Sequence, residues 1–253
     1  VHLQDGTYSI SVDGNEAMAG SMAEMVLEDG RVFGTGTDVK RSRLSKTPVN
    51  EHVVSPFYRQ EGVDFRYNSL CIEFGKGWGM EWRVSDEGAA YRFFGGEKGR
   101  RTVVSDETAE FRFTDDRQVT MAYTTNKEKP YAMAFQNTYS TSLLSEADNS
   151  IPAFLPASVS NGGSSRITIL ESDQKSFPVM FVRPSNGMLE GEFPHYPATT
   201  DKYRGRQQQY VTGTEDYICT FEGVRTFPWR IFAVSRKDTE MPVNDLVYAL
   251  AEP

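Results

Sequence analysis

The sequence predicts an all-β fold, either a large antiparallel sandwich or a barrel. Apolar and polar residues alternate with a period of two in many short segments, as expected for strands that bury one face. Clusters of Gly, Asn, Asp and Ser separate these segments, and almost nothing follows the period of a long helix. With 16 Phe and 12 Tyr in 253 residues, the chain has enough aromatic surface for one large core, so we expect a single domain over residues 1–253.

Ten segments alternate clearly enough to be predicted as strands. They cover residues 7–12, 22–27, 80–84, 89–94, 109–113, 119–123, 131–135, 166–170, 217–221 and 229–234. The clearest hairpin joins 80–84 to 89–94, because the four polar residues between them, 85–88, end in glycine. Many short strands with turns of this kind are typical of a sandwich or a barrel.

Two segments have few strand signals and are predicted as long loops. Residues 35–61 are polar and contain Pro48 and Pro56, and residues 143–165 are rich in Ser, Pro and Gly. The last apolar run, 243–250, is compatible with a short amphipathic helix or with a strand, because a run of this length does not discriminate between them. Of the two, we favour a strand.

Charge and hydropathy exclude two classes of partner. A formal net charge of -8 and an isoelectric point near 5.1 would repel a phosphate backbone, so we expect no nucleic acid. No apolar run approaches the roughly 20 residues of a membrane helix, so we expect no membrane insertion. The one basic cluster is interpreted as a solvated loop and consists of Lys40, Arg41, Arg43 and Lys46.

The sequence does not support a disulfide, an acid–base pair of carboxylates or a zinc site. Cys71 is expected on the polar face of its strand, with Glu73, and Cys219 on the apolar face of its strand, which argues against a disulfide. Asp115 and Asp116 form a turn-like pair that we interpret as a turn and not as an acid–base dyad. Zinc is not supported, because no second His or Cys stands at ligand spacing from His2, His52 or His195.

Four short stretches, in the same order along the chain, carry a family resemblance. They are Tyr67-Asn68-Ser69-Leu70 with the hairpin up to Phe94, Tyr139 with Leu144-Ser145-Glu146, Glu171 with Phe177-Pro178-Val179-Met180, and Arg225-Thr226-Phe227-Pro228-Trp229-Arg230. Together they resemble the amino-terminal domain of glycoside hydrolase family 97, with one residue inserted in the last stretch. The resemblance runs from about residue 60 to the end, and residues 1–58 match only loosely.

This resemblance implies a large antiparallel β-super-sandwich of the galactose-mutarotase-like kind. It implies that the domain is non-catalytic and packs on a C-terminal (β/α)8 barrel that carries the acid and the base or nucleophile. The implied reaction is hydrolysis of α-glucosidic or α-galactosidic bonds, with a carbohydrate substrate and bound calcium. The resemblance also implies a periplasmic or secreted protein, although residues 1–6 show no signal peptide.

The resemblance implies three site residues. The family's loop glutamate that ligates calcium falls on Gln136, whose carbonyl can bind calcium but lacks the charge of a glutamate, so binding should be weak or absent in this chain alone. Asn137 and Glu171 are expected to face the substrate or the barrel. For Glu171 we also keep the alternative of a buried anchor that accepts backbone amides of a loop.

Two other functions remain open. A stand-alone carbohydrate-binding module would use exposed aromatic rings, and the candidates are Tyr58, Trp78, Tyr196 and Tyr203. A purely structural scaffold domain is the third hypothesis. For Arg225, Trp229 and Arg230 we expect contacts at a strand edge and an interdomain seam instead of contacts with sugar.

Overall fold

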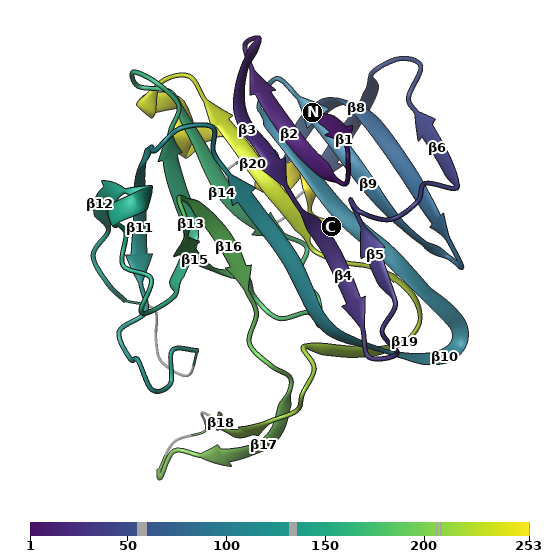
Figure 1. The fold of residues 1–253 in the computed structure, drawn as a ribbon, viewed down its shortest axis with the longest axis vertical. Coiled ribbons are helices and arrows are strands. Elements are labelled where there is room, and N and C mark those ends of the chain that lie inside the picture. The colour runs from purple at the N-terminus through teal and green to yellow at the C-terminus, as the bar shows by residue number, and fades with distance from the viewer. Residues whose placement is uncertain (55–59, 132–135, 206, 208, 253) are drawn as a thin grey trace.

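The structure is a computed structural model that describes residues 1–54, 60–131, 136–205, 207 and 209–252. Within these residues nearly every element is a strand, and every strand pairing is antiparallel (Figure 1). The predicted all-β super-sandwich is confirmed. None of the described helices is long and apolar enough to span a membrane.

One layer of the sandwich is a sheet with the strand order β12-β11-β13-β14-β20-β10-β9-β8-β6. Its strands are β6 (Arg41–Leu44), β8 (Gly62–Gly75), β9 (Trp78–Ser85), β10 (Gly88–Arg112), β11 (Gln118–Tyr123), β12 (Ser140–Leu143), β13 (Ala153–Ser160), β14 (Arg166–Ser172) and β20 (Trp229–Ser235). Strand β7 (Val49–Val54) pairs with the first half of β8.

The second layer forms around the far half of β10, which crosses from one layer to the other (Figure 1). It contains β1 (His2–Gln4), β2 (Thr7–Val12), β3 (Asn15–Ser21), β4 (Ala23–Leu27), β5 (Val32–Gly34), β15 (Phe181–Ser185) and β16 (Met188–Glu192). Strand β19 (Cys219–Thr226) pairs with the middle of β10, where the register shifts between Glu97 and Arg101. Gly96 has a φ of 115° there, and a Cβ would lie 2.1 Å from the Gly223 carbonyl oxygen, so the bend requires glycine.

The main core lies between the two layers and is rich in aromatic rings. Tyr8 of β2 packs on Trp82 of β9, Tyr91 of β10 and Phe232 of β20, with ring centroids 5.2, 5.9 and 5.7 Å away. Phe111, from the far half of β10, lies 5.7 Å from Phe232. These contacts join the layers, and burial of such large side chains supplies most of the stabilisation of a sandwich.

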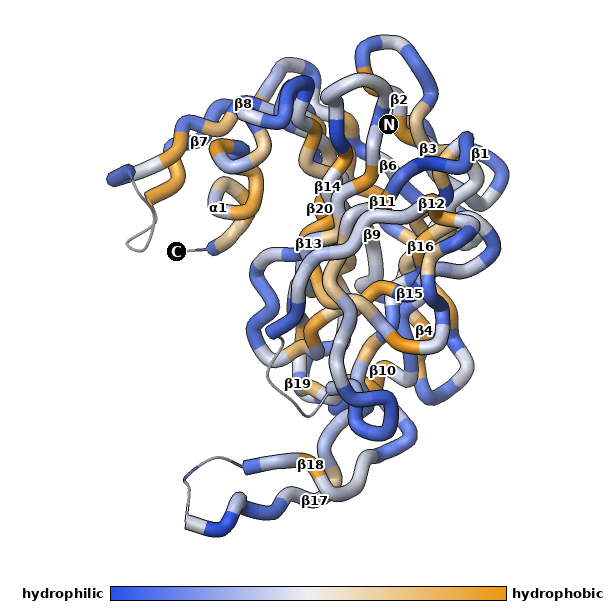
Figure 2. Tube along the Cα trace, turned by 90° about the vertical axis from the view of Figure 1, so that its left-hand side faces the viewer, coloured by the Kyte–Doolittle hydropathy of each residue, from blue (hydrophilic) through white to orange (hydrophobic). Residues whose placement is uncertain are grey.

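A second core covers the outer face of the first sheet. Helix α1 (Leu246–Leu250) buries Leu246, Ala249 and Leu250 against Trp229 and Ile231 of β20. Figure 2 shows α1 beside β7 and β8 on one flank of the sandwich. The prediction of a strand over 243–250 is therefore wrong: the buried positions follow the i, i+3, i+4 spacing of a helix, although only one helical turn and part of another form.

The predicted long loops also contain strands. Residues 35–61 include β6 and β7, and residues 143–165 include β13 and the 3-10 turn η1 (Leu144–Glu146). All four residues of β6 are exposed, so no alternation marks it in the sequence. Strand β13 buries the small Ala153 and Ala157 beside Pro156, and small residues give a weak hydrophobic pattern.

Most of the predicted strands are present. Segment 7–12 coincides with β2, and the hairpin of β9 and β10 is confirmed with Ser85 paired to Gly88, so its loop holds two residues instead of four. Segments 89–94 and 109–113 belong to one strand, β10, which ends at Arg112. Of the segment predicted over 131–135, Tyr131 lies in a turn and 132–135 are outside the described residues.

A separate two-stranded sheet extends from the body as an arm, which we call the β17–β18 arm (Figures 1 and 2). It consists of β17 (Pro197–Lys202) and β18 (Gln209–Thr214). Every residue of β17 is exposed. A 3-10 segment, η2 (Asp238–Val243), connects β20 to α1.

Candidate functional site: an apolar groove beside a buried ion triad

The deepest charge in the described structure is Arg230, whose side chain is 0% exposed. Alternation along β20 places Trp229 and Ile231 in the second core and turns Arg230 to the opposite face. Its Nε and Nη2 donate to the two carboxylate oxygens of Glu107 on β10, both at 2.7 Å, and Nη1 donates to Glu171 Oε2 on β14, also at 2.7 Å. This arrangement pairs the guanidinium in the fork geometry that arginine favours.

Burial opposes the charge of this cation, but the two carboxylates outweigh it. Desolvation lowers the pKa of Arg230, whereas Glu107 and Glu171 raise it, and the net shift is upward. The ring faces of Phe193 and Phe177 lie 4.9 and 5.8 Å from the guanidinium carbon. The triad is therefore a fixed internal element and not a group open to substrate.

Glu171 uses its remaining capacity to hold a loop. Its oxygens accept the backbone N–H of Met180 at 3.0 and 3.1 Å and the Gln174 side-chain amide at 2.5 Å. Burial raises the pKa of the Glu171 carboxyl, against the opposing effects of Arg230 and these amides. With 9% of its side chain exposed, Glu171 matches the buried-anchor alternative.

Arg225 holds the same loop from its other side. Its guanidinium lies over Phe227, Phe221 and Phe177 at 5.1, 5.5 and 6.0 Å, and Nη1 donates to the Ser176 hydroxyl at 3.2 Å. Residues 176–180 are thus held at one end by Glu171, which belongs to the same stretch of family resemblance, and at the other end by Arg225, which belongs to the last stretch.

This fixed loop forms one wall of an apolar groove of about 890 Å³. The β17–β18 arm and its base form the second wall, and residues 128–131 form the third. The groove lining includes the aromatic and apolar side chains of Tyr131, Phe177, Pro178, Val179, Tyr196, Tyr210 and Ile218. Its volume falls within the range of small-molecule ligand sites.

Tyr131 is held in the third wall by an ion pair. Its hydroxyl donates to Glu192 of β16, which also binds Arg183 of β15 through both carboxylate oxygens. Burial would raise the pKa of Glu192, but Arg183 and Tyr131 outweigh it and the pKa is lowered. Arg183 also donates to the Asn149 carbonyl at 2.8 Å, and the Tyr131 ring lies 4.9 Å from Phe181.

The two loop residues predicted at the barrel face follow this wall in the sequence. Gln136 and Asn137 are both exposed. The Asn137 amide donates to the Tyr123 carbonyl at 3.0 Å, and its oxygen accepts the backbone N–H of Thr138 at 2.9 Å. The Glu171 side chain is therefore largely buried, whereas Gln136 and Asn137 lie at the surface.

The described residues contain no group of three or more His, Cys, Asp or Glu that could hold a metal ion. Gln136 would contribute a single neutral oxygen, whereas calcium takes six to eight oxygen ligands. The described residues do not by themselves fit a calcium site, and the other ligands would have to come from a partner.

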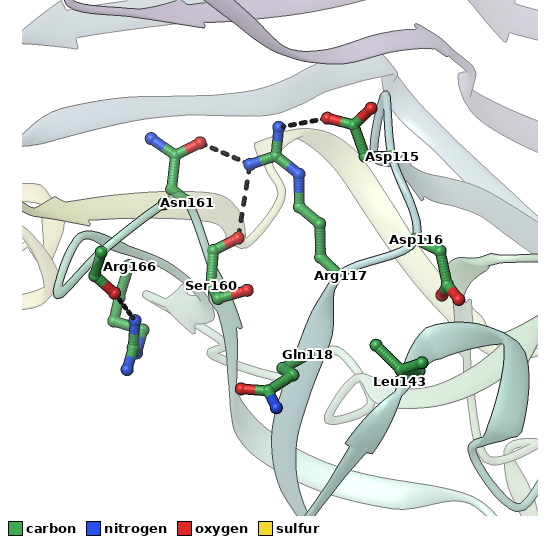
Figure 3. Close-up of a pocket in the computed structure, with 10 residues that line it drawn as sticks. Asp115, Asp116, Arg117, Gln118, Leu143, Ser160, Asn161 and Arg166 are labelled. Atoms are coloured by element: carbon green, nitrogen blue, oxygen red, sulfur yellow. Dashed lines mark hydrogen bonds and ion pairs between the residues drawn. The ribbon is translucent and has the colours of Figure 1, made fainter.

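A polar depression of about 540 Å³ lies elsewhere, at the turn before β11 (Figure 3). Its groups bind one another: Arg117 donates to the Ser160 carbonyl, to Asn161 and to Asp115, and Asp116 accepts the Ser145 N–H and hydroxyl at 3.0 and 2.7 Å. Asp115 and Asp116 thus serve a turn, as predicted. The two bonds of Asp116 to Ser145 also hold the 3-10 turn η1, which gives the Leu-Ser-Glu stretch a structural role.

The aromatic candidates for a sugar-binding module divide into different classes. Trp78 is wrong as a candidate, because it is 2% exposed and stacks between Phe33 and Phe227 at 5.0 and 5.8 Å. Tyr58 lies outside the described residues. Tyr196 and Tyr203 are exposed, and Tyr196 lines the groove.

Other predicted groups also have clear positions. Cys71 and Cys219 are free thiols, and Cys219 is buried in the main core. The basic cluster at 40–46 is exposed, but two of its residues, Arg41 and Arg43, lie on strand β6 instead of a loop. Trp229 is buried between Arg92 and Arg83, whose guanidinium carbons lie 4.4 and 5.0 Å from its ring.

Known proteins share this architecture. Among solved structures, the chain superposes with a TM-score of 0.77 and 15% identity on a glycoside hydrolase family 97 enzyme of Pseudoalteromonas sp. strain K8 in complex with panose, covering 99% of this chain and 36% of that one. It superposes with a TM-score of 0.69 and 18% identity on a beta-arabinopyranosidase, covering 90% and 36%. At these identities the likeness shows the fold alone.

Sequence comparison gives a closer relationship. The chain is 33% identical over 256 residues to a retaining alpha-galactosidase of Bacteroides thetaiotaomicron, an alignment that covers 98% of this chain and 38% of that protein. Fold and sequence together define the class, the β-sandwich domains of glycoside hydrolases. Residues 1–253 match the model of the glycosyl-hydrolase 97 N-terminal family, and the chain belongs to that family.

Proposed function

We propose that this chain is the non-catalytic N-terminal domain of an α-glycoside hydrolase and packs on a (β/α)8 barrel that performs the reaction. The observation that carries the proposal is the match to an N-terminal family over residues 1–253. The chain spans little more than a third of its galactosidase relative, which leaves the length of a further large domain.

The buried carboxylates support this division of labour. A catalytic acid–base pair needs two carboxyl groups that face a cleft and have different pKa values. Glu107 and Glu171 share one guanidinium in the interior, and Glu192 is bound to Arg183 and Tyr131. Glu107 neutralises Arg230, and Glu171 and Glu192 hold two walls of the groove. Such structural roles suit a domain that shapes the rim of another domain's active site.

For the reaction, we propose hydrolysis of α-galactosidic bonds, with α-glucosidic bonds as the second possibility. The α-galactoside choice rests on the galactosidase relative, which is 33% identical. Carbohydrate is thus the proposed substrate of the longer protein, and we propose that the protein is exported to the periplasm or the medium, in keeping with polysaccharide-derived substrates.

The isolated chain is expected not to hydrolyse an aryl α-galactoside or an aryl α-glucoside above the uncatalysed rate, because the acid and the nucleophile or base lie outside it. The product of the intact gene should hydrolyse one of the two. Chromogenic assays on both polypeptides, at equal concentration, test this. Turnover by the isolated chain, or a reading frame that stops at its last residue, would refute the proposal.

For calcium, we propose that Gln136 contributes one neutral oxygen to an ion whose other ligands come from the barrel. The isolated chain should bind calcium with a Kd no tighter than about 1 mM, the weak end of protein sites. In the intact protein, Gln136→Glu adds one negative charge and should tighten binding roughly tenfold, or about 1.4 kcal/mol. Calorimetric titration measures both.

The matched control is Gln4→Glu, since Gln4 is an exposed glutamine on β1. This change adds the same charge at a different part of the surface and should leave the calcium Kd unchanged. Equal tightening by both substitutions would indicate a general charge effect and would remove Gln136 from the ligand set.

The second candidate function, a carbohydrate-binding module, is favoured by a single observation: Tyr196 is exposed and lines the groove. A module of this kind binds sugar without its neighbours. Titration of the isolated chain with raffinose and with panose separates the two functions, because a domain that only supports a barrel gives no binding heat with either sugar.

A further inference from the structure

We propose that the apolar groove beneath the β17–β18 arm receives an apolar segment of the domain that follows this chain in the longer protein. The inference rests on the proposed function and deepens it by naming the surface through which the sandwich meets its catalytic partner. Three properties of the groove lead to it: two rigid walls, one uncovered arm and an apolar lining.

The two walls on the body of the sandwich are preformed. The Glu171 carboxylate fixes the loop at the Met180 N–H, and the Glu192 carboxylate fixes Tyr131. Both anchors are themselves paired to arginines within the sandwich. A preformed surface loses little entropy when a partner is seated on it, which favours docking over a site that must first be ordered.

The arm that forms the remaining wall lacks cover of its own. An isolated two-stranded hairpin is at most marginally stable in water and needs packing against something else. All six residues of β17 are exposed, and the residues of β18 are exposed or half-buried. The arm is tied to the body at its base, where the Tyr196 N–H donates to the Tyr217 carbonyl and the Tyr196 carbonyl accepts the Glu215 N–H. The His195 ring also bonds to the Glu215 carbonyl.

The lining decides between a protein segment and a sugar. Val179 and Tyr196 are 39% and 38% exposed, and they continue the apolar surface of Phe177, Pro178 and Ile218. A sugar site needs several free polar groups for hydroxyls. In this lining the Tyr131 hydroxyl is bonded to Glu192, the His195 Nδ1 to the Glu215 carbonyl and the Thr212 hydroxyl to Thr199, which leaves few polar side chains, Glu128 and Lys129 among them. A contiguous apolar patch of this kind is typical of a protein–protein interface.

The length of the relatives points to the occupant. The galactosidase relative has more than half of its length outside the region that this chain matches, so the same polypeptide has a large domain available to cover the arm. A domain attached in cis is present at a high effective concentration, so an interface of modest area suffices. Its contacting segment should carry Leu, Ile, Val, Phe or Pro side chains to match the lining.

Amide hydrogen exchange tests this in the intact gene product and in the chain of residues 1–253, which has its own buried cores and serves as the reference. Amides of the β17–β18 arm and of Ser176, Phe177 and Val179 should exchange at least about tenfold more slowly in the intact protein, because docking suppresses local opening. Amides of β9 and β20, buried in both polypeptides, should not differ.

Val179→Asp supplies the matching variant. In the isolated chain it replaces an exposed side chain and should leave the thermal midpoint unchanged to within about 1 °C. In the intact protein it should restore fast exchange in the arm. Val39→Asp is the control, because Val39 is also an exposed valine in a non-strand segment and does not line the groove.

Three outcomes would overturn the inference. Equal exchange of the arm in both polypeptides would show that the groove stays open. Protection of the arm in a dimer of the isolated chain, seen by sedimentation, would make a second copy the occupant. Protection of the isolated chain by raffinose or panose would make the groove a sugar site. If the intact protein hydrolyses its substrate while the arm exchanges rapidly, the docking inference fails and the proposed function stands.

Discussion

Arg230→Met is expected to lower the free energy of unfolding by about 3–5 kcal/mol, because it leaves two buried carboxylates without their cation. Glu107 and Glu171 have side chains that are 2% and 9% exposed, so water cannot replace the guanidinium. The Met180 amide and Gln174 would still bind Glu171, but no described cation would remain within salt-bridge distance of either carboxylate. Urea unfolding of the isolated chain, wild-type and variant, measures the difference.

The pH dependence of this loss has a definite sign. Burial already raises the folded-state pKa of Glu171, and removal of Arg230 raises it further. A carboxyl with a raised folded-state pKa stabilises the fold below its unfolded-state pKa, and that contribution is lost as pH rises through the folded-state value. The variant should therefore be closest to wild type in acid and fall further behind toward neutral pH.

Arg236→Met is the matched control. Arg236 also makes a two-bond ion pair, with Asp13, but both side chains are about half exposed, and exposed pairs contribute little to stability. Its unfolding curve should stay close to that of the wild type at every pH. A small effect of Arg230→Met, of the same size as the Arg236 change, would show that the triad does not hold the groove wall.

Trp229→Ala is expected to lower the free energy of unfolding by about 3–5 kcal/mol, the usual range for deletion of a large buried aromatic side chain. Trp229 is 0% exposed, joins the second core with Leu246 of α1, and lies between the guanidinium groups of Arg92 and Arg83. The variant should also lose exchange protection in α1, because that helix packs on the ring.

Trp229→Phe separates the ring from its N–H group. Phenylalanine keeps an aromatic face for Arg92 and Arg83, and the Nε1 that it removes is buried with no hydrogen-bond partner in the described structure. The loss should therefore be about 1–2 kcal/mol, from reduced volume alone. If both substitutions cost the same, stacking on the two arginines contributes nothing and the account of the second core is wrong.

The fold class was predictable because large apolar residues alternate in the strands that pair at the centre of the sandwich. In β2, Tyr8, Ile10 and Val12 are buried at every second position, which is the pattern that the sequence shows. Strand β6 was missed because it has no buried face, and α1 because a single buried turn of helix resembles a short apolar strand. These elements depend on tertiary neighbours, which local patterns do not contain.

The site was predictable only in part, for the same reason. Glu171 was found from its stretch, and the anchor role could be weighed in advance, but its partner Arg230 is distant in sequence. No local signal distinguishes the buried Glu107 from the exposed Asp106 beside it on β10. Tyr131, Arg183 and Glu192 were missed, since the pairing of β15 with β16 brings Arg183 to Glu192, and a tertiary contact from the turn at residue 131 adds Tyr131. Arg183 and Glu192 lie on the two strands of one hairpin, and their ion pair appears only once the register of that hairpin is known.

Affinity labelling of the intact protein tests the central claim, that this domain shapes a site whose reacting carboxylates lie in another domain. A bromoacetyl galactosylamine enters a galactosidase site and alkylates a carboxylate there, and peptide mass spectrometry locates the modified residue. We predict that the label and the loss of activity follow a carboxylate outside residues 1–253. Stoichiometric, inactivating label on a carboxylate within this chain would contradict the account.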